Sequence, residues 1–296
     1  MFSRPLYRSA TTLAVAALAV SLAGCGGSSS GGKQSVKPAS GVNSAAAAKL
    51  SAALKSAGSV KVATDASYAP NEFFASDNKT VQGMDVDLGK AIGAELGLTF
   101  EFSNVSFDSI IPSLGNRFDL GMSSFTDNKK REQTVDMVDY FSAGTAFMVK
   151  SDSSLNPSSV ADLCGKTVAV EKGTTQLDDV TAQKKKCKLT ILAFPDQNAA
   201  NLALQSGRAQ VVLADSPVNA YAAKQSNGQF KIVGQVYGTA PYGIAVPKGG
   251  KYAGFADAIK LALEDLKSKG VYDQIMQKWG IQAGAVSSFT LNGATS

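Results

Sequence analysis

Residues 118–131 read FDLGMSSFTDNKKR, a short strand that ends at Gly121-Met122 and is followed by a turn rich in hydroxyl groups. Arg131 closes this stretch, eight residues after Ser123. In an open α/β sheet, ligands bind outside the carboxyl ends of the strands. Hydroxyl groups there can hydrogen-bond a small polar ligand, and a guanidinium can hold a carboxylate with two parallel hydrogen bonds. The stretch therefore predicts one wall of a ligand site, although a Lys-Lys-Arg-Glu run is also typical of a solvated charged turn.

The rest of the chain repeats this order of strand, polar loop and helix. Such alternation predicts an α/β fold with a parallel sheet and right-handed crossovers. Strands are expected at residues 60–64, 99–102, 118–122, 167–170, 190–194 and 209–214. One helix is expected to end near Gly97, and Asp108 is expected to cap the next. Two further helices should begin at about Gln176 and at Asp196, and two more should cover 255–279 with a break at Gly270.

Four of the expected strands end in polar loops. A helix that begins just after Thr175 offers free N–H groups to an anion, and Arg131 offers a guanidinium. Asp215 supplies an isolated carboxylate for an ammonium group, so the set predicts a site for a zwitterion. Turn or cap chemistry would also explain several of these residues one by one. The loops contain Asp65, then Ser123, Ser124 and Thr126, then Thr174 and Thr175, and finally Asp215.

The N-terminus is typical of an export signal. Arg4 and Arg8 precede an apolar run that is well below the roughly 20 residues needed to cross a bilayer. The ending Leu-Ala-Gly-Cys25 resembles a bacterial lipobox, which predicts a signal peptide at 1–24 and acylation of Cys25; an ordinary secretory signal with an incidental cysteine is the alternative. Residues 25–57 are rich in Gly, Ser, Ala and Lys and are expected to form a flexible tether, with a nascent helix at 45–54.

Composition limits the remaining possibilities. With 296 residues, 44% hydrophobic and 18% charged, the chain can build one large domain or two lobes. The formal charge of +5 falls to about +3 without Arg4 and Arg8, which is too small to indicate nucleic-acid binding. Cys164 and Cys187 remain after the signal, and an even pair in an exported chain predicts one disulfide. The chain has no histidine and no zinc-type cysteine spacing, so neither a metal nor another cofactor is expected.

Several segments between residues 60 and 280 resemble, in the right order, the amino-acid-binding receptors of ATP-driven importers, the family 3 solute-binding proteins. The segments are DASYAPNEF (65–73), GMDVDL (83–88), FDSIIPSL (107–114), MSSFTDNKKR (122–131), GTT (173–175), DSP (215–217), YGIA (242–245) and KWG (278–280). The lipobox and the cysteine pair resemble the actinobacterial lipoprotein branch of that family. Asn71 departs from the family pattern, because an apolar residue usually follows the proline.

The resemblance implies a two-lobe, periplasmic-binding-protein-like fold of type II, with two crossover hinge strands and the ligand in the cleft between the lobes. Lobe 1 would comprise residues 59–141 and 242–296, and lobe 2 residues 146–237. By position, Arg131 would hold the ligand α-carboxylate with Thr126 and Thr175, while Asp215 and the Ser124 region would hold the α-ammonium. Tyr68 and Phe107 would sandwich the ligand side chain, and Asp65 and Glu171 would face its far end.

The implied function is that of the substrate-binding component of an amino-acid ABC transporter. It would be a monomer, lipid-anchored to the outer face of the cell membrane, that binds without catalysis and serves the permease and ATPase subunits. Two carboxylates beside aromatic rings favour a cationic ligand such as lysine, arginine or ornithine. A glutamine receptor, a cyclohexadienyl-dehydratase-like enzyme using Glu171 or Asp65 as acid or base, and a partner of a signalling receptor are the alternatives.

Overall fold

The computed structural model describes residues 41–294 of the chain. The predicted signal peptide, the acylation site Cys25 and the first part of the predicted tether lie outside these residues. Within them, no helix has both the length and the apolar character that a membrane span requires.

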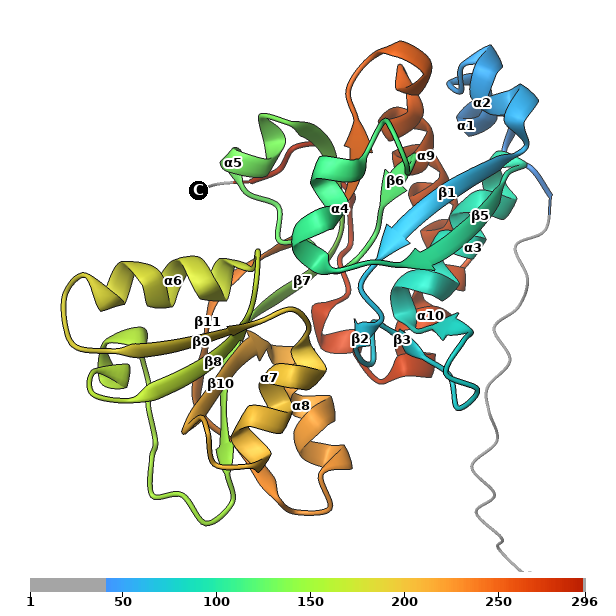
Figure 1. Cartoon of the computed structure of the whole chain (residues 1–296). Coiled ribbons are helices and arrows are strands. Elements are labelled where there is room, and N and C mark those ends of the chain that lie inside the picture. The colour runs from blue at the N-terminus through green and yellow to red at the C-terminus, as the bar shows by residue number, and fades with distance from the viewer. Residues whose placement is uncertain (1–40, 295–296) are drawn as a thin grey trace, which may run out of the picture. The chain divides into compact units, whose positions relative to one another are not determined.

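Within residues 41–294, eight strands form the main sheet, in the order β5-β1-β6-β11-β7-β10-β8-β9 (Figure 1). β1, β5 and β6 run parallel to one another at one end, and β8, β9 and β10 do so at the other. β7 and β11 are antiparallel and join the two parallel groups. The strands are β1 (Ser59–Thr64), β5 (Thr99–Asn104), β6 (Leu120–Gly121), β7 (Val135–Lys150), β8 (Thr167–Glu171), β9 (Thr190–Phe194), β10 (Val211–Asp215) and β11 (Phe230–Pro247). The α/β class is therefore confirmed.

β7 and β11 are the long strands of the molecule, with 16 and 18 residues. Their pairing is regular at both ends and shifts register three times between Val233 and Gly243. The two strands come so close at this crossing that a Cβ on Gly144 would lie 2.6 Å from the carbonyl oxygen of Tyr237. We call the part around β1, β5 and β6 lobe 1, and the part from 146 to 237 lobe 2.

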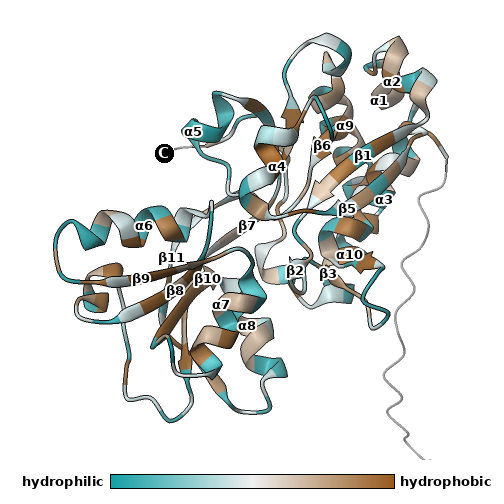
Figure 2. Ribbon diagram, viewed as in Figure 1, coloured by the Kyte–Doolittle hydropathy of each residue, from teal (hydrophilic) through white to brown (hydrophobic). Residues whose placement is uncertain are grey.

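Helices cover both faces of each parallel group, and alternate residues of the strands enter opposite cores (Figure 2). In β1, Val60 and Val62 pack with the helices α3, α9 and α10, whereas Ala63 packs toward α4. In lobe 2, Val168 faces α6 and Ala169 faces α7. The helices are α3 (Met84–Leu96), α4 (Phe107–Ser113), α5 (Lys129–Glu132), α6 (Thr175–Lys184), α7 (Gln197–Gln205), α8 (Ser216–Gln225), α9 (Phe255–Ser268) and α10 (Val271–Trp279). A small sheet of β2 (Ser67–Tyr68), β3 (Glu72–Phe74) and β4 (Val81–Gln82) lies beside lobe 1.

The predicted tether differs from the structure over its last part. Residues 44–57 form the helices α1 (Ser44–Ala48) and α2 (Ala52–Ala57), not a flexible linker. Ala46, Leu50 and Leu54 are buried in the lobe 1 core, and α1 contacts α9. Ala46 lies in α1, Leu54 lies in α2 and Leu50 lies in the turn between them, so both short helices are fixed to lobe 1 by burial of these apolar side chains.

Two further expectations concern local chemistry. Cys164 and Cys187 are joined in a disulfide in lobe 2, which confirms the predicted pairing. Asp108, in contrast, does not cap its helix. Ser106 occupies the N-cap position of α4, and Asp108 lies in the first turn, where a carboxylate is favoured by the helix dipole rather than by a cap hydrogen bond.

Candidate ligand-binding site

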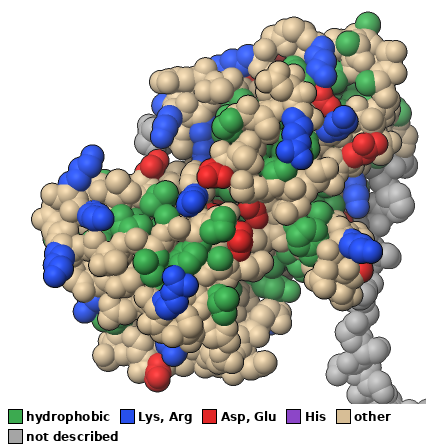
Figure 3. Space-filling view, viewed as in Figure 1, with side chains coloured by type: hydrophobic (Ala, Val, Ile, Leu, Met, Phe, Trp, Pro, Cys, Tyr) green, Lys and Arg blue, Asp and Glu red, His purple; other side chains and the backbone are tan. Residues whose placement is uncertain are grey.

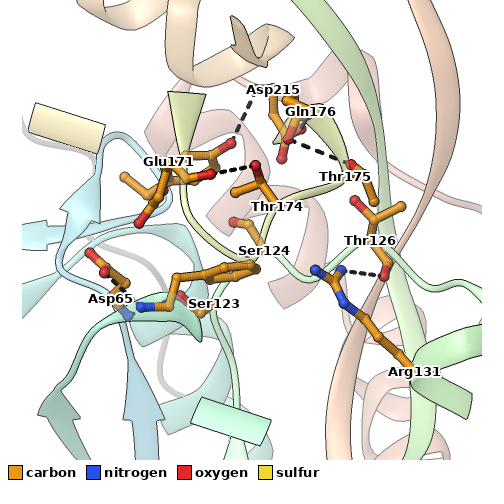
Figure 4. A pocket seen from close by; sticks show the side chains of 12 residues that line it. Asp65, Ser123, Ser124, Thr126, Arg131, Glu171, Thr174, Thr175, Gln176 and Asp215 are labelled. Carbon is orange, nitrogen blue, oxygen red and sulfur yellow. Dashed lines mark hydrogen bonds between the residues drawn. The ribbon is translucent and has the colours of Figure 1, made fainter. Parts of the chain in front are cut away.

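Every residue predicted to bind the ligand lies on the wall of one enclosed cavity (Figure 4). The cavity lies at the carboxyl ends of β1, β6, β8 and β10. Both lobes contribute to it, and its polar groups are unevenly distributed. The lining residues are Asp65, Tyr68, Phe107, Ser123, Ser124, Thr126, Arg131, Glu171, Thr174, Thr175 and Asp215, together with Gln176, which the sequence did not indicate.

Arg131 makes one end of the cavity positive. Its guanidinium donates hydrogen bonds to the carbonyl oxygens of Thr126 (2.6 Å) and Gly173 (3.1 Å). It also lies over the rings of Phe107 and Phe125, 5.4 and 5.2 Å from their centroids. Burial lowers the pKa of Arg131 to about 10, and no ion pair joins it to a carboxylate of residues 41–294. A guanidinium has five donors, so several remain for an anion in the cavity.

The N-terminus of α6 adds to this positive end. Thr174 is the N-cap residue, and its hydroxyl accepts from the N–H of Leu177 and donates to the carbonyl of Glu171. The first N–H groups of a helix have no partner within it and carry the positive end of its dipole. Thr175 begins the helix, and its hydroxyl makes only a 3.5 Å contact with Gln176. Arg131 and this turn together provide hydrogen-bond donors and positive charge for a carboxylate.

Asp215 supplies a fixed carboxylate above the middle of the cavity (Figure 4). One of its oxygens accepts from Gln176 Nε2 at 2.7 Å, and the other accepts from the hydroxyl of Tyr242 at 2.7 Å. Gln176 Nε2 also donates to Thr145 Oγ1, so the amide is itself held in place. Burial raises the pKa of Asp215. A cationic group beside Asp215 would stabilise the charged form of this carboxylate, which burial disfavours.

The end of the cavity opposite Arg131 is acidic (Figure 4). The two oxygens of Asp65 accept from the N–H groups of Ser67 and Phe107, both at 3.0 Å. Glu171 is only 2% exposed, and its Oε1 has no hydrogen-bond partner within the described residues. Burial, and after it the neighbouring charge of Asp65 from the other lobe, raise the pKa of Glu171 well above its usual range. Glu171 is therefore favoured in its neutral, protonated form.

Direct contacts hold the two lobes together around the cavity. The hydroxyl of Tyr68 in lobe 1 accepts from the N–H of Asp215 in lobe 2 at 3.1 Å. Ser67 Oγ accepts in the same way from the N–H of Gln197, at the start of α7. A molecule in the cavity would therefore contact both lobes at once.

A comparison with protein families identifies the chain. Residues 60–282 match the model of the bacterial extracellular solute-binding proteins, family 3. The chain belongs to this family. Its α/β fold is the type II periplasmic-binding-protein fold, which confirms the predicted fold class.

Relatives of this family 3 solute-binding protein resemble most of the chain. The arginine-binding protein ArgT of Corynebacterium glutamicum is 34% identical over 248 residues, which are 81% of this chain and 80% of ArgT. The solved structure of an ancestral arginine-binding protein bound to glutamine is 35% identical, with a TM-score of 0.70, and covers 76% of this chain and 98% of its own. An ancestral amino-acid-binding protein described as a precursor of cyclohexadienyl dehydratase has 33% identity and a TM-score of 0.70, covering 77% and 97%.

In this solute-binding protein the hydroxyls of Ser123 and Ser124 point into lobe 1. Ser123 Oγ accepts from the N–H of Asp65 and donates to Glu72. Ser124 Oγ donates to the other oxygen of Glu72 and accepts from Asn71 Nδ2. Both serines thus support the cavity wall through a buried acid, and their hydroxyls are already occupied.

Asn71, which departs from the family pattern, belongs to the same hydrogen-bond network. Its side chain is fully buried inside lobe 1 and does not line the cavity. Asp85 accepts from the Ser124 N–H and from the hydroxyl of Tyr140, and burial raises its pKa to about 6. Sequence reasoning missed this network because its acids belong to segments that were assigned to loops and helix starts. No group of three or more His, Cys, Asp or Glu residues in 41–294 could hold a metal ion.

Proposed function

We propose that this protein captures one polar L-amino acid between its lobes and passes it to the permease of an ABC transporter. The observation that supports this is that Arg131 and Asp215 both line the cavity, on different walls. A half-buried guanidinium with no ion-pair partner among residues 41–294 and a helix N-terminus face the cavity from one side, and a fixed carboxylate faces it from another. An α-amino acid has a carboxylate and an ammonium group on one carbon, and it satisfies both.

The ligand side chain we propose is cationic. It would extend toward Asp65 and Glu171, where a positive charge gains Coulomb attraction. Glutamate would meet uncompensated like charge there, and an apolar side chain would leave the two acids without a partner. Arginine, lysine and ornithine fit, and the names of two similar proteins refer to arginine. Glutamine is the alternative, since its amide N–H groups can donate to Asp65.

The cellular setting follows from the N-terminal sequence. We propose that the protein is an exported lipoprotein of the actinobacterial branch, held at the outer face of the membrane through acylated Cys25. The permease and the ATPase subunits would be its partners, and the receptor would act as a monomer. Recovery of a lipid-modified N-terminal cysteine by mass spectrometry supports this placement, and a mature chain that begins elsewhere contradicts it.

An enzyme on the same fold is the second candidate, favoured by the buried acid Glu171 and by the precursor of a dehydratase among the similar structures. A carboxyl group with a raised pKa can serve as a general acid. Amino-acid binding is better supported, because Arg131 and Asp215 match both ends of an unreacted amino acid. Turnover of prephenate or arogenate by the purified protein would favour the enzyme.

Calorimetry with arginine, lysine, ornithine, glutamine and glutamate tests the proposed function. We expect the cationic amino acids to bind with the highest affinity and glutamate to show no measurable binding. The variant Asp215→Asn keeps the size of the side chain and removes the partner of the ammonium. Its affinity should fall for every ligand in the series. Tight glutamate binding, or an Asp215→Asn variant with normal affinity, would overturn the assignment.

A further inference from the structure

We propose that Asp65 and Glu171 act as one acid pair that keeps a proton when the bound amino acid has a neutral side chain and gives it up when that side chain is cationic. This inference rests on the proposed function, because it assumes that the cavity binds amino acids. It deepens that function by stating how one site accepts two chemical classes, and it predicts that the choice between them depends on pH.

The two carboxyls come from different lobes and lie at the same end of the cavity (Figure 4). Asp65 follows the last residue of β1, and Glu171 is the last residue of β8. Backbone N–H groups of Ser67 and Phe107 already hold both oxygens of Asp65, so this carboxylate is kept in one orientation and is stabilised in its charged form. Glu171 has no such donors, and its Oε1 is buried without a partner. Of the two, Glu171 is therefore the group that takes the proton.

The surroundings of Glu171 disfavour a second negative charge. Asp65 is its strongest charged neighbour, and Asp196, before α7, and Asp215, at the end of β10, follow. Asp108 on α4 is exposed and lies near Gly173, so it adds further negative charge at the lobe junction. Acidic side chains also gather where the lobes meet on the face shown in Figure 3.

Positive groups lie elsewhere. Arg131 is at the opposite end of the cavity (Figure 4), and Lys172 is exposed. A hollow lined by Asp65, Asp196 and Asn198 lies on the outer side of the pair, and none of the residues that line it is basic. Among residues 41–294 no cation is paired with this acid pair, so either a proton or a ligand cation must neutralise it.

The charge balance of the two complexes follows directly. With glutamine bound, Glu171 keeps its proton and donates it to Asp65, while the ligand amide can donate to the remaining carboxylate oxygens. With arginine bound, the guanidinium supplies the donors and the positive charge, and the proton of Glu171 leaves to solvent. The arginine complex therefore holds one proton fewer than the glutamine complex. Titrating groups whose surroundings are the same in the two complexes cancel in the comparison.

The measurable quantity is the ratio of the glutamine dissociation constant to the arginine dissociation constant. A difference of one bound proton changes this ratio by about tenfold per pH unit. The increase should begin above the ordinary range of a glutamate carboxyl, near pH 5, and should level off once the pH passes the raised pKa of Glu171. At acidic pH the site then loses its preference for the cation.

Calorimetry of both ligands between pH 5.0 and 8.5 tests the inference, and two buffers of different ionisation enthalpy give the proton count for each ligand. We expect the ratio to rise with pH in the wild type. In Glu171→Gln the amide still donates to Asp65, but no proton can leave, so the ratio should become independent of pH. Asp196→Asn is the matched control. It removes a nearby charge, keeps the N-cap of α7 because asparagine also caps, and should retain the pH dependence.

The outcomes separate this inference from the proposed function. If both ligands bind the wild type with a ratio that does not change with pH, the acid pair does not exchange a proton and the inference fails alone. If Glu171→Gln keeps the full pH dependence, the proton comes from another group and the inference also fails. If neither ligand binds at any pH, the proposed function itself is wrong.

Discussion

Replacing Arg131 with methionine should separate binding from stability. The change removes two hydrogen bonds, to the carbonyls of Thr126 and Gly173, and the contacts of the guanidinium with two aromatic rings. Each hydrogen bond contributes about 1 kcal/mol to folding. Against this loss, the variant no longer buries a positive charge without a carboxylate, a situation that lowers the pKa of Arg131 to about 10. The free energy of unfolding should therefore change by no more than about 2 kcal/mol.

Binding should respond very differently. A buried ligand carboxylate would lose its charge-assisted partner, which costs about 2–5 kcal/mol in comparable interfaces. That cost corresponds to an affinity lower by roughly 30-fold to several thousand-fold. Calorimetry with arginine measures the affinity, and urea denaturation of the unliganded protein measures the free energy of unfolding.

Lys130→Met provides the matched control. Lys130 is the neighbouring cation of α5, its side chain is 84% exposed, and its nearest carboxylate oxygen, on Asp178, is 3.9 Å away. This control should bind arginine like the wild type. An Arg131→Met variant with unchanged affinity would refute the role given to the guanidinium. A variant that loses affinity only because it is largely unfolded would refute the separation of binding from stability.

Three further predictions concern the fold. Leu54→Ala should lower the free energy of unfolding by about 2–4 kcal/mol, because Leu54 is 2% exposed in the lobe 1 core, and an unchanged denaturation midpoint would show that α2 is not part of the domain. Replacing Cys164 and Cys187 with serine opens a link between residues 23 apart and should cost about 3 kcal/mol in the same assay; an equally stable variant would contradict this. Burial raises the pKa of Asp127 to about 7, so the folded protein holds a proton that the unfolded chain has released, and this contribution to stability is lost as the pH rises from about 4 to 7. Asp127→Asn should flatten that part of the pH profile measured by thermal unfolding, and an unchanged slope would rule Asp127 out.

The sheet was predictable from sequence where strands are short and follow the regular order of strand, loop and helix. The segments at 60–64, 167–170 and 190–194 end in turn residues and were found almost to the residue. The crossing strands β7 and β11 were not, because their pairing shifts register three times and breaks the regular alternation on which prediction depends. They were expected only from the family resemblance. A nascent helix was expected at 45–54, but the two helices α1 and α2 and their packing on lobe 1 were not, because Ala, Ser and Lys dominate the composition there and hide three buried apolar residues.

The candidate site shows a similar division. Ionisable and hydroxyl residues at strand ends could be recognised, since their chemistry is visible in the sequence and the sheet brings the strand ends together. Gln176 and Tyr242, which hold Asp215, were not recognised as part of the site. An amide in the first turn of a helix and a tyrosine in a long strand have many ordinary structural roles. The roles of Ser123 and Ser124 depend on which way each hydroxyl turns, and the sequence contains no signal for that direction.

A crystal structure of the protein with L-arginine tests the central claim most directly. The α-carboxylate should lie within hydrogen-bond distance of the Arg131 guanidinium and of the first N–H groups of α6. The α-ammonium should lie beside Asp215, and the ligand guanidinium between Asp65 and Glu171. Arginine bound in the reverse orientation, or outside this cavity, would contradict the account.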